Sequence, residues 1–201
     1  MKPSYSKHGP GSQILCIDWE TSGSTFSSYE ETFKQYQGIA FGAVVANATT
    51  FEPVKTMYRE IKFDGKKYKW SKEAEVIHGL SREYLDQNGI TQEEAAADLA
   101  EFILESFGTG KVMLLGHNPH FDIEATVQLL QPYNVMPELF HVVLDTSAAG
   151  YITIGKYKSD DVFEFFTGRN REGCHNALDD ALMALETVRN MRALMDSALG
   201  K

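Results

Sequence analysis

The chain has 201 residues, and its 19 Lys and Arg against 28 Asp and Glu give a formal net charge of −9. This length predicts a single folded domain, and the 43% hydrophobic content excludes a disordered chain. The acidity disfavours the simplest nucleic-acid binder, a protein that neutralises many phosphates with Lys and Arg. Cys16 and Cys174 are too few for a disulfide framework and are expected to be reduced thiols.

Residues 1–12 are polar and rich in Ser, Gly and Pro, which predicts a flexible arm ahead of one domain that spans 13–201. The arm lacks the apolar segment of a secretory signal. No stretch approaches the roughly 18 apolar residues of a membrane span. We therefore expect a soluble, cytoplasmic protein without a membrane partner.

Three strands are predicted first, and as consecutive strands they favour an antiparallel meander. The first ends at Trp19 and is followed by a Ser/Thr/Glu-rich loop, Ser22–Gln37, whose length suggests a functional element or a mobile flap. The predicted strands are Gln13–Trp19, Gly38–Ala46 and Val54–Phe63.

The sequence changes to helical character at Ser71, and SKEAEVIHGL ends at Gly79. Thr91 and Glu94 form a capping box at the start of the clearest helix. Strands that come first as a meander and then alternate with helices predict an α/β fold, a mixed sheet flanked by helices. The remaining predicted elements are the helices Thr91–Phe107, Ile123–Leu130 and Ala177–Leu199 and the strands Val112–Leu115 and Val142–Asp145.

Carboxylates gather at the ends of these elements. Asp18 and Glu20 stand two apart at the end of a strand, so both point to the same face. Two anions held side by side repel each other, and only water or a cation makes that tolerable. Asp122 follows another buried strand, and Asp180 begins the last helix just after His175. Oxygen ligands from three elements suit Mg²⁺ or Mn²⁺.

Each of these pieces alone has an ordinary structural explanation, such as a solvated strand end or an acidic helix start. Their order along the chain is more specific, and it resembles the DnaQ-like 3′-to-5′ exonucleases of the DEDDh class. The resemblance covers essentially the whole predicted domain and consists of five motifs: IDWETSG from Ile17, IHGL from Ile77, GHNPHFD from Gly116, LDT from Leu144 and HNALDDA from His175.

This resemblance implies a ribonuclease-H-like fold, with an antiparallel meander plus parallel strands in one mixed sheet. It implies that two divalent metal ions, Mg²⁺ or Mn²⁺, are held by four carboxylates, with His175 as the general base. A histidine suits that role because much of it is neutral at physiological pH. The implied metal ligands, which are also catalytic, are Asp18, Glu20, Asp122 and Asp180.

Substrate contacts follow from the same resemblance. The backbone at Thr21, Ser22 and Gly23 matches the place where the family receives the terminal sugar, and His78 matches a residue that touches the terminal nucleotide. Asn118 is a further candidate, which either holds substrate or braces the loop before Asp122. For His78 and Asn118, ordinary hydrogen-bonded structure is an equal alternative.

The sequence leaves the roles of two segments undecided. The family moves quickly from the first motif to the second strand, whereas here Ser24–Gln37 is an insertion that could cover the site, contact substrate or bind a partner. A basic segment before His175 could grip a nucleic-acid strand or be a solvated loop. Its residues are Lys156, Lys158, Arg169 and Arg171.

The predicted function is a metal-dependent 3′-to-5′ exonuclease that removes nucleoside 5′-monophosphates from single-stranded DNA or unpaired 3′ ends. An RNA 3′-to-5′ exoribonuclease, similar to an oligoribonuclease, is the alternative, because the motifs position metal and phosphate and do not read the sugar. The third hypothesis is a non-catalytic binding or regulatory subunit with the same fold. A binding module, however, has no reason to keep a cluster of mutually repelling anions.

Overall fold

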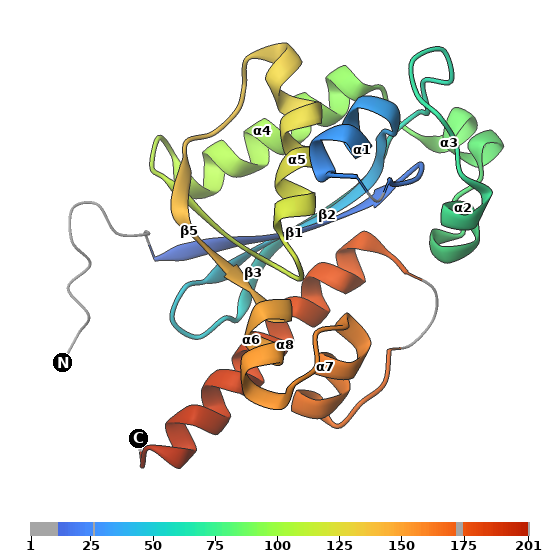
Figure 1. Ribbon diagram of the computed structural model, residues 1–201. Helices are drawn as coiled ribbons and strands as arrows, with labels where there is room; N and C mark the ends of the chain where they lie inside the picture. Colours follow the sequence, from blue (N-terminus) through green and yellow to red (C-terminus); the bar gives the residue numbers. More distant parts are fainter. Residues whose placement is uncertain (1–11, 26, 172–174, 201) are drawn as a thin grey trace.

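A computed structural model describes residues 12–25, 27–171 and 175–200 of the chain (Figure 1). The predicted arm therefore lies outside the described residues except for Ser12, and so does Cys174. Five strands form one sheet in the order β3-β2-β1-β4-β5. Their bounds are β1 (Gln13–Thr21), β2 (Gly38–Asn47), β3 (Pro53–Glu60), β4 (Val112–Gly116) and β5 (Leu139–Asp145).

The sheet is mixed, as the sequence predicted. β1 pairs with β2 and β2 with β3 in antiparallel register, which confirms the meander, whereas β4 runs parallel to both β1 and β5. Helices lie on both sides of this sheet in Figure 1. They are α1 (Tyr29–Gln35), α2 (Lys72–His78), α3 (Arg82–Asn88), α4 (Gln92–Phe107), α5 (His120–Leu130), α6 (Thr146–Ile154), α7 (Ser159–Thr167) and α8 (Ala177–Ala198), with a short 3₁₀ turn at Gln131–Tyr133.

The alternation of side chains along β1 divides the core into two layers. Leu15, Ile17 and Trp19 pack with residues of α4 and α5 on one face of the sheet. Ile14 and Cys16 pack with α8 on the opposite face. Since successive strand residues point to opposite faces, Asp18 and Glu20 belong to the α8 face.

Several helices begin where a capping signal stands in the sequence. The capping box of Thr91 and Glu94 is present at the start of α4, and the Ser71 hydroxyl accepts a hydrogen bond from Ala74 N at the start of α2. Gly79 ends α2 in a left-handed conformation, with φ of 74°. These three boundaries agree with the prediction.

The structure differs from the sequence prediction at several short elements. The insertion, predicted as a loop, contains α1, which starts at the N-cap Ser28 and buries Phe33. α3, α6 and α7 were also not predicted, since helices of seven to nine residues are shorter than the stretch over which apolar periodicity is recognised. α5 begins at His120, so Asp122 lies inside its first turn and not before it.

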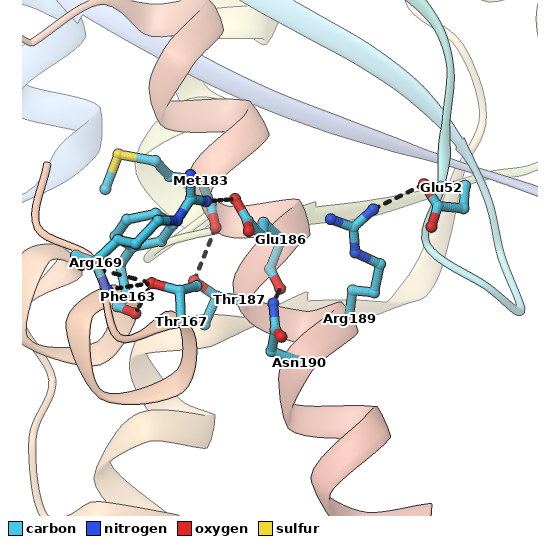
Figure 2. Close-up of polar contacts among 9 residues, drawn as sticks. All are labelled: Glu52, Phe163, Thr167, Arg169, Met183, Glu186, Thr187, Arg189 and Asn190. Atoms are coloured by element: carbon cyan, nitrogen blue, oxygen red, sulfur yellow. Dashed lines mark hydrogen bonds and ion pairs between the residues drawn. The ribbon is translucent and has the colours of Figure 1, made fainter. Parts of the chain in front are cut away.

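The segment after α7 is fastened to the middle of α8 (Figure 2). Arg169 forms an ion pair with Glu186 and lies over the Phe163 ring. Further along α8, Arg189 Nη1 pairs with Glu52 at 2.7 Å, in the connection between β2 and β3. The first contact joins the segment after α7 to α8, and the second joins α8 to the connection between β2 and β3.

None of the helices within the described residues is both long enough and apolar enough to span a membrane.

Candidate active site

Three carboxylates meet at the end of β1. One ligand oxygen each from Asp18, Glu20 and Asp180 lies within 4.8 Å of the other two, and we call these residues the carboxylate cluster. The first two come from one face of β1, and the third comes from the first turn of α8. Four metal-binding carboxylates were predicted, and three of them form this group.

A glycine in β2 allows α8 to begin at this place. Gly42 pairs with Asp18 across the sheet, and a Cβ atom on Gly42 would lie 2.2 Å from the backbone N and Cα of Leu178. Any side chain there would therefore push the first turn of α8 away from β1. The Asn176 side chain caps the same turn by accepting hydrogen bonds from the N–H groups of Leu178 and Asp179.

Asp122, the fourth predicted ligand, lies beside the carboxylate cluster without being part of it. It is 3% exposed in the first turn of α5, a helix held to β1 by a 3.1 Å hydrogen bond from Trp19 Nε1 to Thr126 Oγ1. Burial raises the pKa of Asp122, the backbone N–H groups of Trp19 and Asp122 oppose that change, and the charges of Glu20 and Asp180 add to it. Its charge in turn raises the pKa of Asp18.

The carboxylate cluster holds more negative charge than its protein partners offset. Burial is the largest cause that raises the pKa of Asp18 well above its usual value, followed by the charges of Asp122, Asp180 and Glu20. Burial and Asp180 raise the pKa of Glu20 to about 7, although Arg171 opposes the change. Glu20 is 8% exposed, and its Oε1 has no hydrogen-bond partner in the described part of the chain.

These observations fit a divalent cation. A buried carboxylate oxygen without a partner loses its solvation and gains nothing in return. A cation bound among Asp18, Glu20 and Asp180 would supply that partner and would offset the repulsion between the three charges. The all-oxygen donor set is the type that Mg²⁺ and Mn²⁺ prefer.

His175 contacts the carboxylate cluster through Asp180. Its Nδ1 lies 3.2 Å from Asp180 Oδ2, and its side chain is 43% exposed. An ionised carboxylate only accepts hydrogen bonds, so Nδ1 is the donor and the neutral ring keeps its lone pair on Nε2. His175 also lines a cleft of about 710 Å³, which is bordered by Asn118, Tyr157 and Lys158.

The residues after Glu20 are largely committed to bonds within the protein. The buried Ser22 donates its hydroxyl to Lys69 O and accepts from Gln37 N, at 2.8 and 2.9 Å. The hydroxyl of Thr21 donates to Gly23 O at 3.0 Å. Gly23 has φ of 153°, and a Cβ atom on it would lie 2.4 Å from the Tyr36 ring. These contacts fix the backbone of Thr21, Ser22 and Gly23, which the family resemblance assigns to binding the terminal sugar.

His78 and Asn118 have different surroundings. His78 Nδ1 accepts a hydrogen bond from Leu80 N at 3.0 Å, and Nε2 has no hydrogen-bond partner within the described residues. Burial lowers the pKa of His78, so its ring is neutral over a wider pH range. Asn118 has a left-handed backbone with φ of 58°, and its N–H donates to Asp145 Oδ1 at 3.0 Å.

The insertion touches the loop that precedes Asp122. The Tyr29 hydroxyl donates to Asn118 Oδ1 at 3.0 Å, and the Tyr29 ring packs edge-on against Phe121 with centroids 5.7 Å apart. Tyr29 therefore braces the Asn118 loop from α1. Sequence reasoning did not single out Tyr29, and it missed Gly42 as well, although a glycine within a strand signals a close backbone approach.

Three of the four residues of the predicted basic segment form ion pairs, whereas Lys158 forms none with the described residues and borders the cleft beside His175. Lys156 lies 3.6 Å from Asp161, and Arg169 is bound to Glu186 on the side of α8 (Figure 2). Arg171 alone of these pairs enters the carboxylate cluster, where its Nη1 contacts Asp180 Oδ1. The sequence grouped Arg171 with its neighbours and did not indicate this contact.

A mixed sheet in this order with helices on both faces is the ribonuclease-H-like α/β fold, and the predicted fold class is confirmed. The solved structures that share it include E. coli exonuclease I in complex with a 5cy-dT13 oligonucleotide, with a TM-score of 0.70 and 17% identity over 90% of this chain.

Two further structures agree with this likeness. A zinc-bound complex of E. coli exonuclease I with single-stranded DNA has a TM-score of 0.72 and 17% identity over 91% of this chain. Exonuclease I from Methylocaldum szegediense has a TM-score of 0.67, with 17% identity and 91% coverage. This chain spans 41% of the length of each of these three proteins. No family model and no curated protein sequence matches the chain.

Proposed function

We propose that the protein is a metal-dependent 3′-to-5′ exonuclease that hydrolyses single-stranded DNA. The observation that carries this proposal is the carboxylate cluster with His175 beside it, at the end of β1. The likeness in fold to exonuclease I structures that contain single-stranded oligonucleotides supports the same class of substrate.

In this proposal, Asp18, Glu20 and Asp180 hold two Mg²⁺ or Mn²⁺ ions, and Asp122 completes the set of acidic ligands. The unpartnered oxygen of Glu20 and the raised pKa of Asp18 support this assignment. The metal ions would supply Lewis-acid stabilisation of the charge that develops at the scissile phosphate. A related zinc-bound complex is consistent with divalent-metal chemistry on this fold.

His175 is the proposed general base. Its hydrogen bond to Asp180 leaves Nε2 able to accept a proton from the attacking water, and its exposure lets it reach the cleft. The protonated imidazole is then stabilised by the carboxylate of Asp180. The expected product is a nucleoside 5′-monophosphate.

The backbone of Thr21, Ser22 and Gly23 is proposed to receive the terminal sugar. The hydrogen bonds of Ser22 on both sides keep this turn rigid before substrate arrives, which lowers the cost of ordering it on binding. His78 is the proposed contact to the terminal nucleotide, because its buried Nε2 carries the ring proton and faces the backbone of Thr21, in the turn proposed to receive the sugar. Asn118, which Tyr29 braces, would contact the strand from the cleft side.

The test incubates the protein with Mg²⁺ or Mn²⁺ and with end-labelled single-stranded DNA and RNA of one sequence. We expect stepwise shortening of DNA from the 3′ end. We expect Asp18→Ala to lower the rate by at least about a thousandfold, because removal of a metal ligand abolishes most of the electrostatic stabilisation. Glu93→Gln, an exposed carboxylate of α4, is the matched control and should retain full activity.

Three results would contradict the proposal in different ways. If the Asp18→Ala variant still degrades DNA, the assignment of Asp18 as a metal ligand is contradicted. Shortening of RNA and not of DNA would replace the substrate with the alternative of an exoribonuclease. Inactivity on both polymers, with a folded protein that binds Mn²⁺, would favour the binding subunit.

A further inference from the structure

Both oxygens of Asp180 are already engaged by cationic or polar groups of the chain itself. Oδ1 accepts from Arg171 Nη1, and Oδ2 accepts from His175 Nδ1 at 3.2 Å. The side chains of Arg171 and Asp180 are each only 10% exposed, so this ion pair is largely shielded from water. Glu20, by contrast, has a free oxygen in the same carboxylate cluster.

Arg171 has a second anchor outside the carboxylate cluster. Its Nε donates to Asp160 Oδ1 at 2.7 Å, and Asp160 lies in the first turn of α7. The guanidinium therefore connects α7 to the start of α8. Asp160 is 60% exposed and lines the cleft that His175 also borders.

A guanidinium beside Asp180 repels a divalent cation that approaches the same carboxylate, and a shielded site strengthens this repulsion. Arg171 therefore competes with a metal ion for Asp180, and release of Arg171 favours metal binding there. Because its Nε remains bound to Asp160, the released arginine stays at the edge of the site. Its freed N–H groups then have one carboxylate partner, Asp160, in place of the two that Arg171 had before, and they can accept another anion.

We propose that Arg171 is the counter-ion of Asp180 in the metal-free protein and that, once metal takes Asp180, Arg171 binds a phosphate of the nucleic-acid strand. The chemistry of the guanidinium fits this exchange, because its planar fork binds carboxylate and phosphate oxygens in the same bidentate geometry. The inference rests on the proposed nuclease function for its second half, whereas the first half concerns metal binding alone.

The other basic residues of this segment are not equivalent to Arg171. Arg169 pairs with Glu186 of α8, as Figure 2 shows, and Lys156 pairs with Asp161. Lys158 borders the cleft and forms no ion pair with the described residues. Among the described Lys and Arg side chains that form ion pairs, Arg171 is the one whose partner belongs to the carboxylate cluster. Arg169 is thus a matched control: the same residue type, two positions away, with its own carboxylate partner.

The first experiment measures Mn²⁺ binding by calorimetry with no nucleic acid present. Arg171→Ala removes the competing cation, so we expect Mn²⁺ to bind about tenfold more tightly, the size of one charge-assisted hydrogen bond. Arg169→Ala should stay within about twofold of the wild type. Unchanged or weaker Mn²⁺ binding in a folded Arg171→Ala protein would overturn the proposal.

The second experiment measures binding of a labelled single-stranded oligonucleotide in the presence of saturating Mn²⁺, on a His175→Ala background that prevents turnover. We expect Arg171→Ala to weaken this binding about tenfold, because one phosphate loses its guanidinium, and Arg171→Lys to recover part of the loss. Equal oligonucleotide affinity with and without Arg171 would overturn the second half of the proposal.

Asp160→Asn tests the tether without removing the guanidinium. Arg171 then has only Asp180 as an anion, so we expect weaker Mn²⁺ binding than in the wild type and weaker oligonucleotide binding as well. If these contacts were only structural, both Asp160→Asn and Arg171→Ala would have a lower melting temperature. Both variants would then also bind Mn²⁺ and the oligonucleotide more weakly. If the wild type has no nuclease activity but Arg171→Ala still binds Mn²⁺ more tightly than the wild type, the proposed function is rejected. The counter-ion role of Arg171 is then retained.

Discussion

Glu20 is the residue whose state depends most directly on whether the site holds a cation. Folding raises its pKa from 4.5 to about 7, first through burial and then through the charge of Asp180. A carboxyl group with a higher pKa in the folded state binds more protons there than in the unfolded state. Its contribution to stability is therefore present below pH 4.5 and is lost as the pH rises through 7.

This linkage predicts that the chelator-treated protein loses stability between about pH 5 and pH 8. The pKa values of Asp18 and Asp122 are raised as well, so they act in the same direction. Glu20→Gln removes one of the three charges, and we expect it to be more stable than the wild type at pH 8 by about 2–3 kcal/mol, with little difference at pH 5. Urea unfolding at the two pH values measures this.

The control for that experiment is Mn²⁺ itself. With saturating Mn²⁺ the wild type should recover the stability that it loses at pH 8, because binding to the folded state alone adds to the free energy of unfolding. Glu20→Gln should gain less from Mn²⁺. If Glu20→Gln is destabilised equally at both pH values, Glu20 forms a favourable contact within the protein. Its negative charge is then already offset without a metal ion.

At the scale of elements, the position of Asp180 depends on how closely α8 approaches the sheet. Gly42 allows that approach, because a Cβ atom there would lie 2.2 Å from the backbone of Leu178. The obstacle would be main chain at the start of a helix and not a side chain that can rotate. The helix would therefore have to move as a unit, and Asp180 would move with it.

Gly42→Ala is expected to cost about 1–3 kcal/mol in the free energy of unfolding, the usual cost of overpacking, and to weaken Mn²⁺ binding at least about tenfold. Urea unfolding and calorimetry measure the two effects. Gly110→Ala is the control, since its Cβ atom would lie 3.1 Å from Phe107 O, remote from the carboxylate cluster. Normal Mn²⁺ affinity in Gly42→Ala would mean that α8 does not depend on Gly42 to position Asp180.

Features that depend on local patterns within one strand or helix could be predicted from the sequence. Asp18 and Glu20 share a face because strand alternation is a local rule, and Thr91 and Glu94 cap α4 through a local contact. The fold class and the antiparallel meander followed from such patterns. α1 was missed although Ser28 stands three residues before Glu31, a capping signal that too few apolar residues accompany.

Contacts between distant segments were beyond the reach of these rules. The pairing of Arg171 with Asp180 depends on how α7 and α8 pack, and the brace from Tyr29 to Asn118 joins positions 89 residues apart. Nothing in the local sequence distinguishes Arg171 from Arg169. The family resemblance named four acidic residues, and the structure places three of them close together. The resemblance carried no information about the counter-ion.

At the scale of the whole molecule, the net charge of −9 sets how a nucleic acid can be held. Many cationic side chains are already paired with carboxylates, including those of Arg59, Lys111, Arg169, Arg171 and Arg189. A broad basic groove is therefore not available on these residues. In the proposal above, positive charge for a phosphate strand comes mainly from bound metal and from Arg171 released beside it, with Lys158 at the border of the cleft as a further cation.

A short footprint of this kind has a measurable consequence in the salt dependence of binding. If about two or three phosphates are neutralised by the protein, the logarithm of the association constant should fall against the logarithm of salt concentration with a slope of about −1.5 to −2 for a single strand. Fluorescence anisotropy with labelled single-stranded DNA, Mn²⁺ and His175→Ala protein gives this slope.

Chelation of the metal should then abolish binding at every salt concentration, because the carboxylate cluster becomes a repulsive anion at the point where the strand end enters. Arg171→Ala should reduce the magnitude of the slope by about 0.7, the contribution of one phosphate contact on a single strand, whereas Arg169→Ala should leave it unchanged. A slope steeper than about −5 that persists without metal would instead require a cationic surface of seven or more contacts, and strand binding would then not depend on the metal site.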